Sequence, residues 1–208
     1  MDKRILLSSH YFPCISYFAC LVSSNKSVID FGEHFIKQSY RNRCLIYSAN
    51  GVLPLSIPVV KNGKTPMNEV GLDINSDWKT LHWRAIRSAY NSSPFFEFYS
   101  DDLKEVFFTE YASLVEFNSC LLLHICNEIG ISIRFETSSV YIDPKNTDLD
   151  LRVLLNPKSK YDIALDFPRY IQIFEGKHGF IENLSILDLL FHEGPETLSY
   201  LKRLDLNL

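Results

Sequence analysis

The pattern of apolar and polar positions begins with a strand that runs into a helix. Arg4 to Ser9 is a short, mainly apolar stretch. A helical period then follows through Ile15, Phe18 and Val22. Apolar residues three and four positions apart lie on one face of a helix, so we expect that face to be buried.

A β-hairpin is the strongest local signal in the chain. Asn50-Gly51 separates two apolar runs, residues 44–47 and 53–59, and this dipeptide favours a two-residue hairpin turn. Pro54 and Pro58 fall on the same face of the second run. Because proline donates no amide hydrogen, we expect that run to form an edge strand or to contain an early bulge.

The second half of the chain is mainly helical in pattern. One helix is predicted from Trp78 and a longer one from Asp101 to a stop at Gly130, and the C-terminal part predicts a helix over 186–191 and a last one from Gly194. Further short elements are predicted at 131–135, 150–155 and 170–174. Strands and helices are interspersed, so the expected fold class is α/β (or α+β). We expect a single compact domain over residues 1–208, with a mixed sheet, one β-hairpin and several packing helices.

Composition and charge narrow the classes of function. The chain has 208 residues, 46% of them hydrophobic, which is enough for a core without metals or disulfides. Its net charge is −4 and no block of five like charges occurs, so we expect no DNA partner. The apolar run 11–22 is shorter than the roughly 18 residues of a membrane span. We therefore expect no membrane span and a cytoplasmic location.

Familiar catalytic and metal-binding motifs do not occur. The five cysteines form no C-x-x-C pair and the six histidines have no ligand spacing, so we expect buried thiols and no metal site. No phosphate loop, G-x-G-x-x-G, H-E-x-x-H or G-x-S-x-G is present, and no cofactor is expected.

The segment 37–43 is the first candidate site. Lys37, Arg41 and Arg43 bring three cations together, and Gln38 and Asn42 add hydrogen-bonding amides. Guanidinium groups match the geometry of phosphate and carboxylate, so this segment could hold an anionic substrate. In an extended segment the three cations would share one face. The alternative is an ordinary solvated entry to a strand.

An aromatic cluster is the second candidate. Trp78 and His82 are four residues apart on one helical face, and Tyr90 follows on the same predicted helix. Aromatic walls beside an imidazole suit a sugar or nucleotide ring, with His82 as proton acceptor. The alternative is that these rings belong to the core.

Two further pairs have spacings that permit chemistry. Asp188 and His192 are four residues apart, so the carboxylate could orient the imidazole. Cys14 follows Pro13 at a predicted helix start, with His10 four residues before it, so a nucleophilic pair is conceivable. The alternatives are a wet helix face and an inert buried thiol.

The order of these segments resembles the WbqC-like protein family. The resemblance extends from Leu7 to about Leu201. It is carried by Tyr11-Phe12-Pro13 with Tyr17-Phe18, residues 38–43, Asn50-Gly51 with 55–59, Trp78 with His82, Tyr90 with 93–96, and residues 184–191 with Gly194. Many members have Gln-Pro where this chain has Ser8-Ser9-His10.

The resemblance implies a bacterial protein of surface-polysaccharide or related biosynthesis that transfers an acyl or aminoacyl group to an amino sugar or lipid precursor. Its partners would be a small anionic or sugar-derived substrate and an acyl or aminoacyl donor. In that reading His82 is the base that deprotonates the amine. Lys37, Arg41 and Arg43 hold phosphate, while Gln38 and Asn42 orient the acceptor. The pocket walls are Tyr11, Trp78 and Tyr90, and Asp188 supports them. Oligomeric state stays open.

Two other readings use the same residues. A noncatalytic ligand-binding or scaffold protein would recognise a biosynthetic intermediate or a partner enzyme through these clusters. A purely structural subunit would leave the clusters apart on the surface. Convergence of Arg41, Arg43, His82 and Tyr11 around one cleft would argue against the structural reading.

Overall fold

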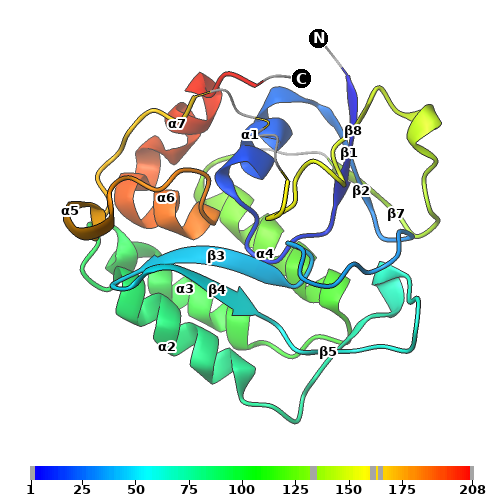
Figure 1. The fold of residues 1–208 in the computed structure, drawn as a ribbon, viewed down its shortest axis with the longest axis horizontal. Helices are drawn as coiled ribbons and strands as arrows, with labels where there is room; N and C mark the ends of the chain where they lie inside the picture. The colour runs from blue at the N-terminus through cyan, green and yellow to red at the C-terminus, as the bar shows by residue number, and fades with distance from the viewer. Residues whose placement is uncertain (1–2, 132–134, 160–162, 164–165, 207–208) are drawn as a thin grey trace.

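A four-stranded parallel sheet forms one side of the protein (Figure 1). The computed structural model describes residues 3–131, 135–159, 163 and 166–206. The strands in spatial order are β7 (Phe135–Ser138), β2 (Lys26–Asp30), β1 (Arg4–Ser8) and β8 (Leu149–Asp150). Helix α1 (Ile15–Ser23) connects β1 to β2, as a parallel pair requires. The predicted strand followed by a helix is confirmed.

The predicted hairpin is present as an isolated two-stranded sheet. Strands β3 (Arg43–Ser48) and β4 (Gly51–Ser56) pair antiparallel, with Leu45 opposite Pro54. Gly51 has a φ of 95°, which only glycine adopts readily. Because β3 is the one partner of β4 among the described strands, Pro54 lies on an edge strand, as expected.

A small antiparallel pair follows the hairpin. It consists of β5 (Val59–Val60) and β6 (Gly71–Leu72), with the 3-10 turn η1 (Met67–Glu69) between them. This pair was not predicted, since strands of two residues leave no periodic pattern.

Three helices follow, where two were predicted. They are α2 (Trp78–Tyr90), α3 (Phe96–Phe108) and α4 (Leu114–Glu128). The single helix from Asp101 to Gly130 is wrong because Ser113 starts a new one. The Ser113 hydroxyl accepts from the Glu116 amide (3.3 Å), and the Glu116 carboxylate accepts from the Ala112 amide (2.8 Å). These two bonds resemble a capping box, which favours a helix start.

The C-terminal part is helical, as expected, but its predicted strand at 170–174 is wrong. The elements here are η2 (Pro144–Asn146), α5 (Glu175–His178), α6 (Ile186–Glu193), η3 (Gly194–Glu196) and α7 (Thr197–Arg203). The Ile173 amide donates to Nε2 of His192 (3.2 Å), so it is satisfied by a side chain and not by a strand. In the element predicted at 131–135, residues 132–134 lie outside the described part. No helix in the described ranges combines the length and apolar character needed to cross a membrane.

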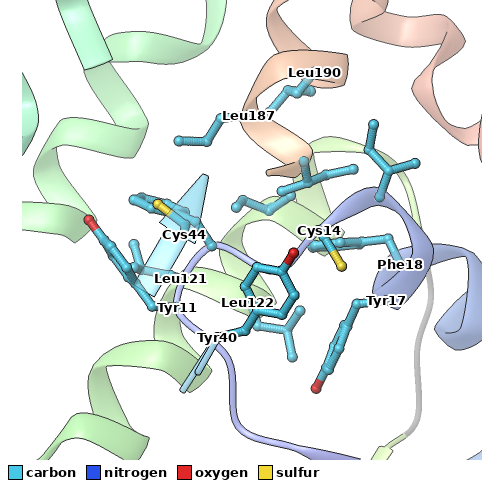
Figure 2. Close-up of a cluster of buried hydrophobic side chains, with 14 of the residues drawn as sticks. Tyr11, Cys14, Tyr17, Phe18, Tyr40, Cys44, Leu121, Leu122, Leu187 and Leu190 are labelled. Atoms are coloured by element: carbon cyan, nitrogen blue, oxygen red, sulfur yellow. The ribbon is translucent and has the colours of Figure 1, made fainter. Parts of the chain in front are cut away.

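One hydrophobic core joins these elements. Figure 2 shows side chains from α1, α4, α6 and β3 meeting in it, among them Phe18, Leu122, Leu187 and Cys44. In Figure 1 the hairpin lies between α2 and α6. Helices α1 and α4 lie between this hairpin and the parallel sheet. The fold is therefore mixed α/β, as the sequence predicts.

Candidate functional site

A groove of about 800 Å³ lies at the open end of the β3–β4 hairpin. Its volume falls within the usual range of ligand pockets, about 300 to 1,000 Å³. We call it the basic groove. It is lined by Phe35, Lys37, Gln38, Asn42, Arg43, Ile57, Pro58, Val59, Lys61 and Gly63.

Among the described residues that line the basic groove, three are cations and none has a carboxylate. Lys37 and Arg43 come from the segment before and at the start of β3, and Lys61 follows β5. Neither Lys37 nor Arg43 makes an ion pair with any residue that the structure describes. A concave surface with charge of one sign concentrates ligands of the opposite sign, so the groove suits an anion.

Backbone pairing fixes the two sides of the groove. The Ile57 amide donates to the Asn42 carbonyl (2.8 Å), and Nδ2 of Asn42 donates back to the Ile57 carbonyl (2.7 Å). Nε of Arg43 donates to the Ser56 hydroxyl (2.8 Å) across the hairpin. The guanidinium is thus oriented by its Nε, while Oδ1 of Asn42 accepts no bond from the described residues.

Four of the predicted substrate-binding residues line this one groove: Lys37, Gln38, Asn42 and Arg43. Gln38 has a φ of 57°, and its side-chain oxygen accepts from Nζ of Lys158 (2.7 Å). The segment is therefore turned and not extended before β3, and the expectation of one extended face is wrong. Phe35 and Lys61 were not predicted as site residues. Their place in the groove becomes visible only from the folded structure, because the groove forms where two distant segments of the chain come together.

The structure does not bring Arg41 to the groove. Its side chain is 1% exposed and forms two bonds to Glu33, from Nε to Oε1 (2.9 Å) and from Nη2 to Oε2 (2.6 Å). Nη2 also donates to the Ser8 hydroxyl (2.9 Å). Burial raises the pKa of Glu33, and the Arg41 guanidinium opposes that rise. Arg41 therefore ties the segment before β3 to the end of β1.

His82 and Tyr11 form a buried pair that does not line the groove. Nδ1 of His82 lies 2.9 Å from the Tyr11 hydroxyl, and the ring is 7% exposed. Burial lowers the pKa of His82 to about 4, although a hydrogen bond to the Ser56 carbonyl opposes this. Figure 2 shows Tyr11 beside Cys44 and Leu121, within the core. The geometry gives His82 two hydrogen-bonding partners and little contact with solvent.

Trp78 and Tyr90 are core residues as well. Trp78 packs edge-on against the rings of His82 and Phe117, at centroid distances of 5.3 and 5.5 Å. The Tyr90 hydroxyl accepts from the backbone amide of Tyr47 (3.1 Å). Both side chains thus fix the packing of α2 and do not line the basic groove.

Asp188 lies in a buried network that also includes the Tyr90 hydroxyl. One of its carboxylate oxygens accepts from the Tyr170 hydroxyl (2.6 Å) and from Nε2 of Gln172 (2.8 Å). Burial raises the pKa of Asp188, and its proximity to His192 opposes that rise. Nδ1 of His192 instead lies 2.6 Å from the Asp188 backbone carbonyl, with the carboxylate 3.9 Å away. Asp188 and His192 are therefore four residues apart on one helix, but the Asp188 carboxylate lies closer to Tyr170 and Gln172 than to His192.

A smaller cavity of about 230 Å³ also borders the 38–43 segment. Tyr40 lines it. Lys158, which donates to Gln38, lies in the sequence between two of its lining residues, Pro157 and Ser159. Glu182 is the one charged residue among the described residues that line it. The cavity is larger than the roughly 150 Å³ that accommodates benzene, so it has room for a small group.

An ion-pair network closes the carboxyl ends of the parallel strands. Ligands often bind there in open α/β sheets. Here the buried Arg152 reaches from Asp150 on β8 to Asp30 on β2 (2.6 and 2.5 Å) across the end of β1. The Tyr141 ring covers the guanidinium, with its centroid 4.8 Å away. The structure thus favours the basic groove over the sheet edge.

Comparison with known proteins identifies the family of this chain. The model of the WbqC-like protein family matches residues 8–160, a range that includes the whole basic groove. The uncharacterized protein Rv1507c of Mycobacterium tuberculosis is 27% identical over 228 aligned positions, covering 97% of this chain and 98% of that protein. No solved structure matches the chain significantly. The family match covers well over half of the chain, and the chain belongs to the WbqC-like protein family.

Proposed function

We propose that the protein binds the phosphate or pyrophosphate group of a small biosynthetic precursor in the basic groove. One observation carries this proposal: Lys37, Arg43 and Lys61 converge on a single groove whose described lining contains no carboxylate. Charge-assisted hydrogen bonds from lysine and arginine to phosphate are the strong ones in proteins.

We further propose that the precursor belongs to surface-polysaccharide or related biosynthesis, and that the reaction is acyl or aminoacyl transfer to an amino group. The amine nitrogen would attack the donor's carbonyl carbon and form an amide bond. The donor's ester or thioester bond would break, and its oxygen or sulfur would leave with the electron pair and take up the proton that the amine loses. The smaller cavity supports this proposal because Glu182, its one charged described lining residue, would attract the ammonium group of an aminoacyl donor, which takes no part in the bond changes.

A noncatalytic binding function is the second candidate. The observation that favours it is the position of His82, which is 7% exposed and does not line the groove. A base whose pKa lies near 4 also has little tendency to accept a proton at neutral pH. In this reading the groove recognises the same anionic precursor without any chemical step.

A thermal-shift screen tests the binding proposal. The panel would contain nucleotide sugars, sugar phosphates, nucleotides and coenzyme A thioesters, each with the wild type, Arg43→Ala and Arg4→Ala. Arg4 is the control because its side chain is 43% exposed and lies outside the groove. A ligand at 100 times its Kd adds about 2.7 kcal/mol to stability. We expect a shift that Arg43→Ala loses and Arg4→Ala keeps.

Two results would contradict the proposal. An equal rise in melting temperature for the wild type and Arg43→Ala would place the ligand outside the groove. No rise with any phosphate compound would show that the groove does not bind this class of ligand. A donor and an acceptor that each raise the melting temperature would then be incubated together with the protein. Formation of the amide product would support the transferase, and its absence would support the noncatalytic binder.

A further inference from the structure

Phe35 gives the basic groove an aromatic wall. Its ring is half-buried and lines the groove, as does Lys61, whose Nζ lies 5.8 Å from the ring centroid. Because the ring lines the groove, part of its surface borders the space that a ligand would fill, and Lys61 lies over one face of it. An aromatic face attracts cations and stacks with flat rings.

The backbone holds Phe35 in this position. Its amide donates to the Thr65 carbonyl (2.9 Å), and the Met67 amide donates to the Glu33 carbonyl (2.8 Å). Residues 33–35 are therefore hydrogen-bonded to the segment that follows Lys61. The aromatic wall and the cations belong to one connected frame.

The charge and size of the groove exceed what a single phosphate needs. Three cations balance the two to three negative charges of a diphosphate near neutral pH. A volume of about 800 Å³ suits a ligand of drug or cofactor size. Ile57, Pro58 and Val59 add apolar lining, which an inorganic anion would leave unused.

An unused acceptor completes the set. Oδ1 of Asn42 is buried and accepts no hydrogen bond from the described residues, although Nδ2 of the same amide is engaged. Because this oxygen is fully covered, a base or ribose donor would reach it only after the Asn42 side chain turns toward the groove.

From these features we infer that the basic groove binds a nucleoside diphosphate group, with the diphosphate among Lys37, Arg43 and Lys61 and the base stacked on Phe35. This inference rests on the proposed function, since it names the class of ligand for the same groove. A sugar precursor carried on such a group would extend beyond the groove from its terminal phosphate.

Calorimetric titration with pyrophosphate, UDP and ADP tests the inference. The proteins would be the wild type, Phe35→Leu, Phe35→Trp and Phe98→Leu. Leucine keeps apolar bulk without an aromatic face, and Phe98 is the control because it is 74% exposed and outside the groove. We expect at least one nucleoside diphosphate to bind the wild type about fivefold or more tightly than pyrophosphate. Phe35→Leu should lose that advantage while its pyrophosphate affinity stays; Phe35→Trp and Phe98→Leu should keep it.

The outcomes separate this inference from the proposed function. Equal affinities for pyrophosphate and both nucleotides in the wild type, or an advantage that survives in Phe35→Leu, would overturn the inference and leave the anion site standing. Failure of all three ligands to bind the wild type would overturn the proposed function and the inference together.

Discussion

Arg41 and Glu33 form a two-point ion pair in the interior of the protein, with Nη2 and Oε2 2.6 Å apart. Arg41 stands between Tyr40, which lines the smaller cavity, and Asn42, which lines the basic groove. The pair therefore holds in place the turn from which both cavities are built. Arginine side chains in one short segment thus have two different tasks: Arg41 anchors the turn and Arg43 faces the groove.

Replacing Arg41 should destabilise the fold. Arg41→Met leaves the Glu33 carboxyl buried without its partner, and breaking a buried pair in this way costs about 3 to 5 kcal/mol. The double variant Arg41→Met/Glu33→Leu should recover part of the loss, because no buried charge is left unpaired. Urea unfolding at pH 7 measures both.

Arg43→Ala is the matched control for this experiment. Its side chain is only partly buried and makes one bond to Ser56, so the change in unfolding free energy should stay below about 1 kcal/mol. Equal losses in Arg41→Met and Arg43→Ala would show that the Glu33 pair has no special role.

Gly32 allows the loop over the sheet edge to approach closely. A Cβ at this position would collide with the backbone of Val140 and Tyr141. The same contact covers Asp30, whose carboxylate accepts from the Gly32 and Ile142 amides (2.8 and 3.2 Å). Gly32→Ala should displace that loop and cost about 1 to 3 kcal/mol, measured by thermal or urea unfolding.

Gly176 supplies the control for Gly32. A Cβ there would meet no atom within 4 Å, so Gly176→Ala should leave stability nearly unchanged. If both alanine variants have the same urea midpoint of unfolding as the wild type, the loop does not approach Gly32 this closely in solution.

The pH dependence of stability should reflect His82. Burial lowers its pKa from 6.5 to about 4, so at pH 5 the unfolded chain binds a proton that the folded protein excludes. Stability should therefore fall as the pH drops from about 6.5 toward 4. This residue alone contributes a loss of roughly 3 kcal/mol at the lower end.

His82→Gln should flatten this profile, because glutamine is uncharged and keeps hydrogen-bonding capacity toward Tyr11. His34→Gln is the control, since that histidine is exposed. Urea unfolding between pH 4 and 7.5 gives the profiles. Parallel curves for the wild type and His82→Gln would contradict the buried, neutral imidazole.

The sequence predicts elements best where the signal is local. Asn50-Gly51 marks the hairpin because a tight turn depends on its own two residues. The break between α3 and α4 was missed because the apolar period continues through Tyr111, so only Ser113 and Glu116 mark the new start. Both of these are common surface residues, and their cap becomes clear only from its geometry.

The candidate site was partly predictable for the same reason. Lys37, Gln38, Asn42 and Arg43 are close in sequence and line one groove. Lys61 joins them through pairing between distant segments, which the sequence does not show. The helical period also placed Trp78 and His82 on one face correctly, but it does not tell whether that face meets a cleft or the core.

A structure of the protein bound to pyrophosphate would test the central claim most directly. We predict that the anion lies in the basic groove, within hydrogen-bonding distance of Arg43 and at least one of Lys37 and Lys61. The account would be contradicted if pyrophosphate bound instead in the smaller cavity beside Glu182, or displaced Arg152 from Asp30 at the sheet edge.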